Sequence, residues 1–284
     1  MSDDWFSYQL APDGDVEDGC HPEEAQAMKD YLRQRTTAIE AAQAITHPIA
    51  TADNPSDDLS RLWALLMNSF LELPAEHTES LLELLKTIES LPEPDFTAVD
   101  KLNRPYEKLW KGLCGFGHHW YDSYRAGCWR NDVAATKSPE RDALRDTHVR
   151  KAEIEAQFVM ADIGNFPIDW GYEAVADALE SSDAVLDFEV PAAARWLVTC
   201  SQRFRQGAEN GEKLEGQPLR PRIKPSSKDP SGDLWKVSSD RAMSLGRWSW
   251  WEGRLRELQG EQGIVKDAAT TALDAMRNAV HAPS

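Results

Sequence analysis

Apolar residues recur at spacings of three and four along almost the whole chain, and this periodicity limits the fold more than any other feature. Such spacing places apolar side chains on one face of an α-helix, because a helix turns once every 3.6 residues. No stretch of five or six residues alternates apolar and polar side chains in the manner of a half-buried strand. The sequence therefore predicts an all-α protein, a single multi-helix bundle of about eight to ten helices.

Proline, glycine and capping residues divide this pattern into helices. The first predicted helix runs from Pro22 to Thr46 and ends before Pro48. A helical hairpin follows, with one arm ending at Pro74 and the other at Pro92, and its short loop makes the two arms antiparallel. Further helices are predicted over residues 106–113, 118–126, 138–163, 169–180, 190–206, 239–258 and 264–280.

The chain is expected to form one domain over residues 1–284, with a flexible N-terminus at 1–20 and a long loop at 207–235. That loop holds four glycines and four prolines with few apolar residues. A segment of this composition buries too little surface to order itself. Loops of this length are uncommon in compact domains, and this one is interpreted as either a lid or a disordered insertion.

Charge is distributed unevenly along the chain. Apolar residues make up 41% and charged residues 28%, as in soluble globular proteins, and the net charge is −17. Residues 1–100 hold 5 basic and 21 acidic side chains, whereas residues 201–256 hold 12 basic and 7 acidic ones. A negative field repels phosphate backbones and anionic lipids, which disfavours nucleic-acid and membrane binding. The basic region is expected either to meet an anionic ligand or to pair with the acidic third of the chain.

Several classes of protein are disfavoured by what the sequence lacks. It shows no apolar run of membrane-spanning length and no signal peptide, so we expect a cytoplasmic protein. Cys20, Cys114, Cys128 and Cys200 are widely spaced, which favours free thiols and gives no metal site. No dinucleotide-binding glycine motif, P-loop, metalloprotease or hydrolase motif is present. An enzyme built from this chain is expected to use no cofactor.

Eleven tryptophans are the most unusual count in the composition. Tryptophan serves cores first and binding pockets second. Trp248, Trp250 and Trp251 cannot share one helical face, so at least one of them points away from the main core. The aromatic residues interpreted as candidate walls of a substrate pocket are Trp110, Phe116, Tyr124, Trp129, Trp170, Trp196 and Trp248.

The segment 115–125 concentrates titratable side chains beside aromatic ones. On a helix His118 and Asp122 are i,i+4 neighbours, and Asp122 and Arg125 are i,i+3 neighbours. A carboxylate that fixes a histidine tautomer prepares a general base, although a surface histidine and a capping aspartate explain the pattern as well. The candidate catalytic residues are His118, His119, Tyr121, Asp122 and Arg125.

The long predicted helix at 138–163 carries a second group of charged residues at spacings of three and four. Most of this ridge is interpreted as a solvated face with ion pairs. His148 and Glu155, two turns apart, form an alternative candidate site.

Four motifs resemble a family of filamentous-fungal proteins catalogued as a domain of unknown function. They are Arg61-Leu62-Trp63 through Leu91-Pro92, Trp110-Lys111-Gly112-Leu113 with Phe116-Gly117, Val190-Pro191 through Arg195-Trp196, and Arg247-Trp248-Ser249-Trp250-Trp251. The resemblance covers roughly residues 57–280. It implies an all-helical fungal protein, sometimes encoded near natural-product genes, and it implies no catalytic residues.

Two functions from different classes follow as hypotheses. In the first, an aromatic-lined helical pocket binds a hydrophobic natural-product intermediate, and the chain is a cofactor-independent, pericyclase-like cyclase or isomerase. In the second, the chain is a non-enzymatic helical module that binds a partner protein, and a homodimer is compatible with both. A large closed apolar cavity would favour the first hypothesis, and a shallow surface patch would favour the second.

Overall fold

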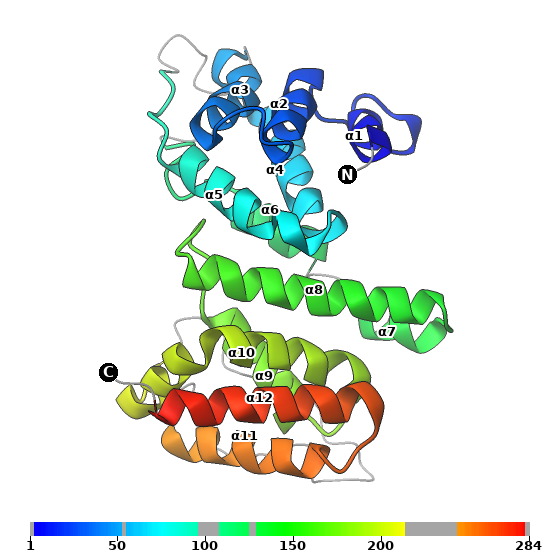
Figure 1. Ribbon diagram of the computed structural model, residues 1–284, viewed down its shortest axis with the longest axis vertical. Coiled ribbons are helices and arrows are strands. Elements are labelled where there is room, and N and C mark those ends of the chain that lie inside the picture. The colour runs from blue at the N-terminus through cyan, green and yellow to red at the C-terminus, as the bar shows by residue number, and fades with distance from the viewer. Residues whose placement is uncertain (1–2, 53–54, 96–107, 125–128, 214–242, 282–284) are drawn as a thin grey trace. The chain divides into compact units, whose positions relative to one another are not determined.

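The computed structural model describes residues 3–52, 55–95, 108–124, 129–213 and 243–281, apart from the side chains of residues 56, 57, 131 and 132. In these residues the chain forms twelve α-helices and no β-strand, which confirms the all-α class (Figure 1). The expected count of eight to ten helices is too low. Apolar periodicity does not indicate the short helices α1 and α7, nor the break between α2 and α3. No helix in the described part is long and apolar enough to cross a membrane.

The helices fall into two compact units. The first contains residues 1–127 and 161–166, and the second contains residues 128–160 and 167–284. Whether the two units together form the single domain expected from the sequence depends on how they associate. The single domain therefore stays a prediction. The helices of the first unit are α1 (Asp3–Leu10), α2 (Pro22–Leu32), α3 (Ala38–Thr51), α4 (Pro55–Glu72), α5 (Thr78–Glu89) and α6 (Phe116–Tyr124). Those of the second are α7 (Trp129–Ala135), α8 (Glu140–Met160), α9 (Asp169–Glu180), α10 (Leu186–Asn210), α11 (Leu245–Leu258) and α12 (Gly263–His281).

In the first unit α3 packs against α2, α4 and α5, and α6 packs against α4 (Figure 1). The helical hairpin expected from the sequence is present as α4 and α5, which contact each other, and the antiparallel course of its two arms stays a prediction. Its leucine stripes are buried because they repeat on one face of each helix, as at Leu62 and Leu66 in α4 and at Leu81 and Leu85 in α5.

The single helix expected over residues 22–46 is wrong, since α2 and α3 are separate helices. Gln34 adopts a left-handed backbone with φ of 57°, which an α-helix does not contain. Thr37 then caps α3, and its hydroxyl oxygen accepts a hydrogen bond from the Glu40 N–H. Pro48 lies inside α3 and does not end it, because buried Ile49 continues the packing beyond the proline.

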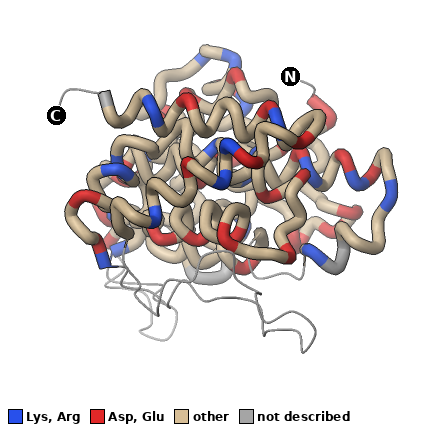
Figure 2. Tube along the Cα trace, turned by 90° about the horizontal axis from the view of Figure 1, so that it is seen from below, with Lys and Arg blue, Asp and Glu red and all other residues tan. Residues whose placement is uncertain are grey.

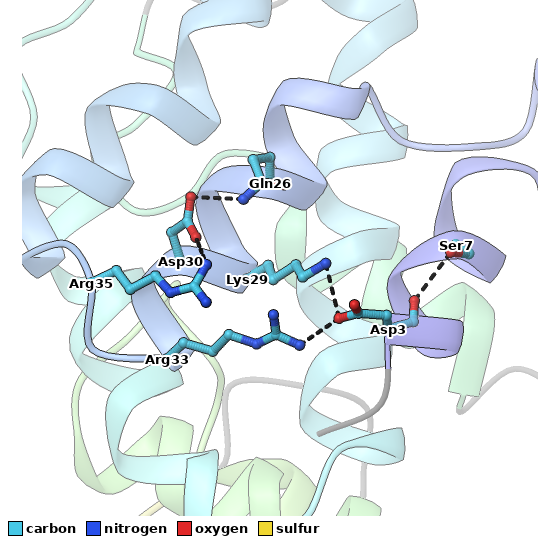
Figure 3. A network of polar contacts seen from close by, with 7 residues as sticks. All are labelled: Asp3, Ser7, Gln26, Lys29, Asp30, Arg33 and Arg35. Carbon is cyan, nitrogen blue, oxygen red and sulfur yellow. Dashed lines mark hydrogen bonds and ion pairs between the residues drawn. The ribbon is translucent and has the colours of Figure 1, made fainter.

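The N-terminal helix α1 is held against α2 by charged side chains. Figure 3 shows Asp3 of α1 between Lys29 and Arg33, with its carboxylate 2.9 Å from Lys29 Nζ and in contact with the Arg33 guanidinium. The hydrogen bond from Lys29, followed by that from Arg33, lowers the pKa of Asp3. Residues 3–10 form this helix. The expected flexibility of residues 1–20 stays a prediction.

In the second unit α10 packs against α8, α9 and α12 (Figure 1). Its helix continues to Asn210 and ends at Gly211, whose φ of 60° suits glycine. The expected loop at 207–235 is therefore wrong over its first four residues, and residues 214–235 lie outside the described part of the chain.

The Arg-Trp-Ser-Trp-Trp motif contributes to the core of the second unit. Trp248 and Trp251 of α11 are buried, and the half-buried Trp250 packs against the same core. The expectation that at least one of the three points away from the main core is therefore wrong. Glu180, at the end of α9, accepts hydrogen bonds from Arg247 Nε at 2.6 Å and Trp251 Nε1 at 2.7 Å. The Arg-Trp-Ser-Trp-Trp motif thus joins α11 to α9.

Candidate functional site

The outer face of α6 presents three of the five candidate catalytic residues. His118, Tyr121 and Asp122 are all exposed, and His118 Nε2 lies 3.2 Å from Asp122 Oδ2. The i,i+4 contact expected from the sequence is present. The two side chains are 77% and 58% exposed, so water competes for their contact. Arg125 lies outside the described residues.

His119 is the half-buried member of this group. Burial lowers the pKa of its imidazole, and the neighbouring His118 lowers it further. The ring is therefore neutral near pH 7, which leaves one nitrogen as a donor and the other as an acceptor.

Beneath α6 lies a cluster of buried aromatic rings. The ring centroid of Trp63 is 6.4 Å from that of Trp110 and 5.4 Å from that of Phe116. Phe116 and Trp120 both pack edge-on against Phe166, with ring centroids 5.9 and 6.0 Å apart. These five side chains are 0–7% exposed. The rings fill the space between themselves, and the cluster forms a core that supports α6.

Two glutamates organise the turn that carries Trp110. Glu93 accepts hydrogen bonds from the backbone N–H groups of residues 109, 110 and 111, at 2.6, 3.1 and 2.8 Å. Glu89 accepts one from the Gly112 N–H at 2.9 Å. The helix expected over 106–113 is wrong for residues 108–113, since these carboxylates bind the N–H groups in a turn. Sequence reasoning missed both glutamates because nothing local links them to this turn.

The second unit contains a stacked group that we call the Trp129 cluster: Trp129, Arg130, Arg141, His148, Phe188 and Glu189. The Trp129 ring lies 4.4 Å from the His148 ring and 5.9 Å from the Phe188 ring. Arg130 stacks on Trp129 at 5.0 Å and Arg141 on Phe188 at 4.7 Å. His148 is therefore part of an aromatic and cationic stack, and the solvated ridge expected on α8 is wrong at this position.

Glu189 is the buried acid of the Trp129 cluster. Burial raises the pKa of its carboxyl group to about 7, against the opposing effects of Arg130 and of the Val185 N–H. One of its oxygens contacts Arg130, and the other accepts from the Val185 N–H at 2.5 Å. Both oxygens are thus occupied, and Glu189 caps the start of α10. Glu155, the other candidate on α8, is 1% exposed.

Trp196 and Trp248 are buried in the core of the second unit, and Trp170 packs against that core. The Nε1 donors of Trp196 and Trp248 have no hydrogen-bond partner among the described residues. A buried N–H without an acceptor costs roughly 1–3 kcal/mol. Trp196 and Trp248 are therefore candidate wall residues whose buried indole N–H groups have no hydrogen-bond acceptor among the described residues.

The structure separates the candidate pocket walls. Trp110, Phe116 and Tyr124 belong to the first unit, together with the candidate catalytic residues. Trp129, Trp170, Trp196 and Trp248 belong to the second unit. Neither unit by itself brings the seven aromatic residues together. Within the described residues, no group of three or more histidine, cysteine, aspartate or glutamate side chains is arranged to hold a metal ion.

The sequence was compared with models of known protein families. Residues 63–255, more than half of the chain, match the family described as Protein of unknown function (DUF3632). The chain belongs to this family. The DUF3632 region begins at Trp63 of the aromatic cluster and ends at Leu255 of α11, and it therefore includes α6, the Trp129 cluster and both core indoles. Comparisons with curated proteins and with solved structures found no match.

Proposed function

We propose that this protein is a helical interaction module whose acidic first unit binds a positively charged segment of a partner protein. The observation that carries the proposal is the division of charge between the units. The first unit has 10 basic and 24 acidic residues, and the second has 21 and 24, which leaves net charges of −14 and −3. Figure 2 marks the acidic and basic positions of the described residues along the chain.

Two further observations support a binding role. Trp110 and Phe116, which were expected to line a pocket in the first unit, both pack against Trp63 in a buried core, and Tyr124 packs against Trp120. The same core supports α6, which presents an exposed tyrosine between a histidine and an aspartate. Tyrosine on a rigid helix is typical of protein interfaces, and a strong negative field attracts basic partners.

The test uses a short synthetic peptide in which arginines alternate with alanine and serine, and a matched peptide with neutral citrulline in place of arginine. We expect the full chain to bind the arginine peptide at about 0.15 M NaCl and to lose most of that binding at about 1 M, where the screening length falls from about 8 Å to about 3 Å. Fluorescence anisotropy measures both. Equal binding of the two peptides, or no binding, would contradict the proposal.

The unpartnered Nε1 donors of Trp196 and Trp248 support a second candidate function. An indole N–H that lacks an acceptor can donate to a ligand carbonyl, which is the polarisation that a cofactor-independent cyclase or isomerase requires. The ligand would be a hydrophobic natural-product intermediate. With this second candidate function we also propose that the protein is fungal and cytoplasmic, that its gene lies near natural-product genes, and that it forms a homodimer.

Under this second reading, Trp196→Phe and Trp248→Phe should abolish the thermal shift caused by a bound intermediate, because phenylalanine lacks the donor. Candidate intermediates from host extracts serve as probes. An unchanged thermal shift in both folded variants would remove this candidate.

A further inference from the structure

A shallow groove of about 380 Å³ follows the outer face of α5. Six of its lining residues repeat at helical spacing on that face, and the seventh belongs to the segment 161–166 of the same unit. They are Glu79, Leu82, Glu83, Lys86, Thr87, Ser90 and Ala161. The opposite face of α5 carries buried Leu81, Leu84, Leu85 and Ile88, so the helix is fixed in the core.

The polar atoms of this α5 groove are mostly acceptors. Glu79 and Glu83 are i,i+4 neighbours that place two carboxylates on the groove side. Glu83 Oε2 also accepts a hydrogen bond from the Tyr31 hydroxyl at 3.0 Å, which holds that carboxylate in place and leaves Glu79 as the more accessible acceptor. The Thr87 hydroxyl donates its hydrogen to the Glu83 carbonyl at 2.7 Å, and the Ser90 hydroxyl donates to the Thr87 carbonyl at 2.8 Å. Both hydroxyl oxygens therefore keep lone pairs to accept from a ligand. The negative end of the α5 dipole lies at the same end as Ser90.

The remaining lining residues set the shape of the ligand. Leu82 and Ala161 are half-buried and offer an apolar contact between the polar groups. Among the described residues that line the groove, Lys86 is the one basic side chain, and it opposes a bound cation. A volume of about 380 Å³ lies at the small end of the range of ligand pockets. The groove suits one side chain with an aliphatic stem and a cationic head that donates several hydrogen bonds.

We propose that the α5 groove binds an arginine side chain of the basic partner segment. This inference rests on the proposed function as an interaction module. Arginine fits better than lysine because its planar guanidinium has five donors in a fixed fork and matches a pair of carboxylates. Its aliphatic stem lies along Leu82 and Ala161.

The test measures binding of the arginine peptide to variants of the full chain. Glu79→Gln should weaken binding by about two- to fivefold, as expected for one exposed ion pair. Lys86→Gln should tighten binding by a similar factor of about two to five, because it removes the opposing charge. The tightening is the sharper result, since damage to the fold cannot produce it.

Two matched variants in the second unit control for net charge. Glu261→Gln and Lys266→Gln change the charge of the chain by the same amounts at exposed positions, the first in the turn before α12 and the second on α12. Both should leave binding of the peptide unchanged within about 1.5-fold. Circular dichroism and thermal unfolding confirm that all four variants fold.

The outcomes separate this inference from the proposed function. If the wild-type chain does not bind the arginine peptide, the proposed function fails. If it binds the peptide but Glu79→Gln behaves like Glu261→Gln, or Lys86→Gln behaves like Lys266→Gln, the groove is not the binding site and only this inference fails. If spermidine competes with the peptide as effectively as an unlabelled arginine peptide does, the groove takes a small polycation, and the assignment to a partner segment is wrong.

Discussion

Glu24 lies fully buried near the start of α2, and its carboxyl group has few partners. Oε2 accepts a hydrogen bond from the His21 N–H at 2.9 Å. Oε1 has no hydrogen-bond partner among the described residues. Burial raises the pKa of Glu24 to about 8, and nearby Asp58 raises it further, whereas the His21 N–H and Arg61 lower it. The folded protein therefore favours the protonated form of this acid.

Glu24 should make the protein less stable as the pH rises. The pKa is about 8 in the folded state against an ordinary value of 4.5, so between these values the folded state holds a proton that the unfolded state has released. Its stabilising contribution is complete below pH 4.5 and is lost as the pH rises to about 8. We expect Glu24→Gln to raise the free energy of unfolding by on the order of 2 kcal/mol at about pH 9 and to change it little at about pH 4.

Chemical denaturation at several pH values measures this effect. Glu23→Gln is the matched control, because Glu23 is the exposed neighbour on the same helical turn. A Glu24→Gln variant with the same pH profile as the wild-type chain would show that Glu24 is ionised in the folded state.

At the scale of the helix, caps decide boundaries that periodicity leaves open. Residues 33–37 hold no apolar side chain but also no proline or glycine, so the punctuation by Pro22 and Pro48 predicts one helix through them. The Thr37–Glu40 capping box starts a new helix there, with the Glu40 carboxylate accepting from the Thr37 N–H at 2.9 Å. The capping box is visible in the sequence as Thr-x-x-Glu. This motif is the sequence signal that indicates the break between α2 and α3.

Thr37→Ala should lower the free energy of unfolding by about 1 kcal/mol, because the N–H groups at the start of α3 lose an acceptor. Thr271→Ala is the control, since Thr271 is exposed in the middle of α12 and its hydroxyl donates only to the Asp267 carbonyl. Alanine favours the helix interior, so this control should be neutral or slightly stabilising. Equal losses in both variants, measured by urea unfolding, would contradict the capping role.

At the scale of the whole molecule, charge and apolar surface are used differently by the two units. The first unit carries almost all of the net charge over a core of leucine and aromatic side chains. The second balances its charges, as where Arg247 pairs with Glu180 and Arg203 with Glu212. Excess charge of one sign acts over several ångströms and steers partners, whereas paired charges stabilise local geometry. This difference is why the proposed binding surface lies on the first unit.

The sequence by itself determined the helical class and most of the helix positions. Helix periodicity is local, because each apolar residue relates to others three or four positions away. The prediction for residues 169–180 agrees with α9 at both ends, and the i,i+4 contact of His118 with Asp122 followed from the same rule. The exposure of that pair did not follow, since a helix face becomes surface or core only through what packs against it.

Only the tertiary structure decided which aromatic residues share a core and which acids have partners. Trp110 and Trp129 lie nineteen positions apart in the sequence, yet they belong to different units. Glu93 binds the backbone of residues 109–111, and Glu180 binds Arg247 across 67 positions. Burial, a shifted pKa and a groove are relations between elements that are distant along the chain, and the spacing of residues within one helix carries no information about them.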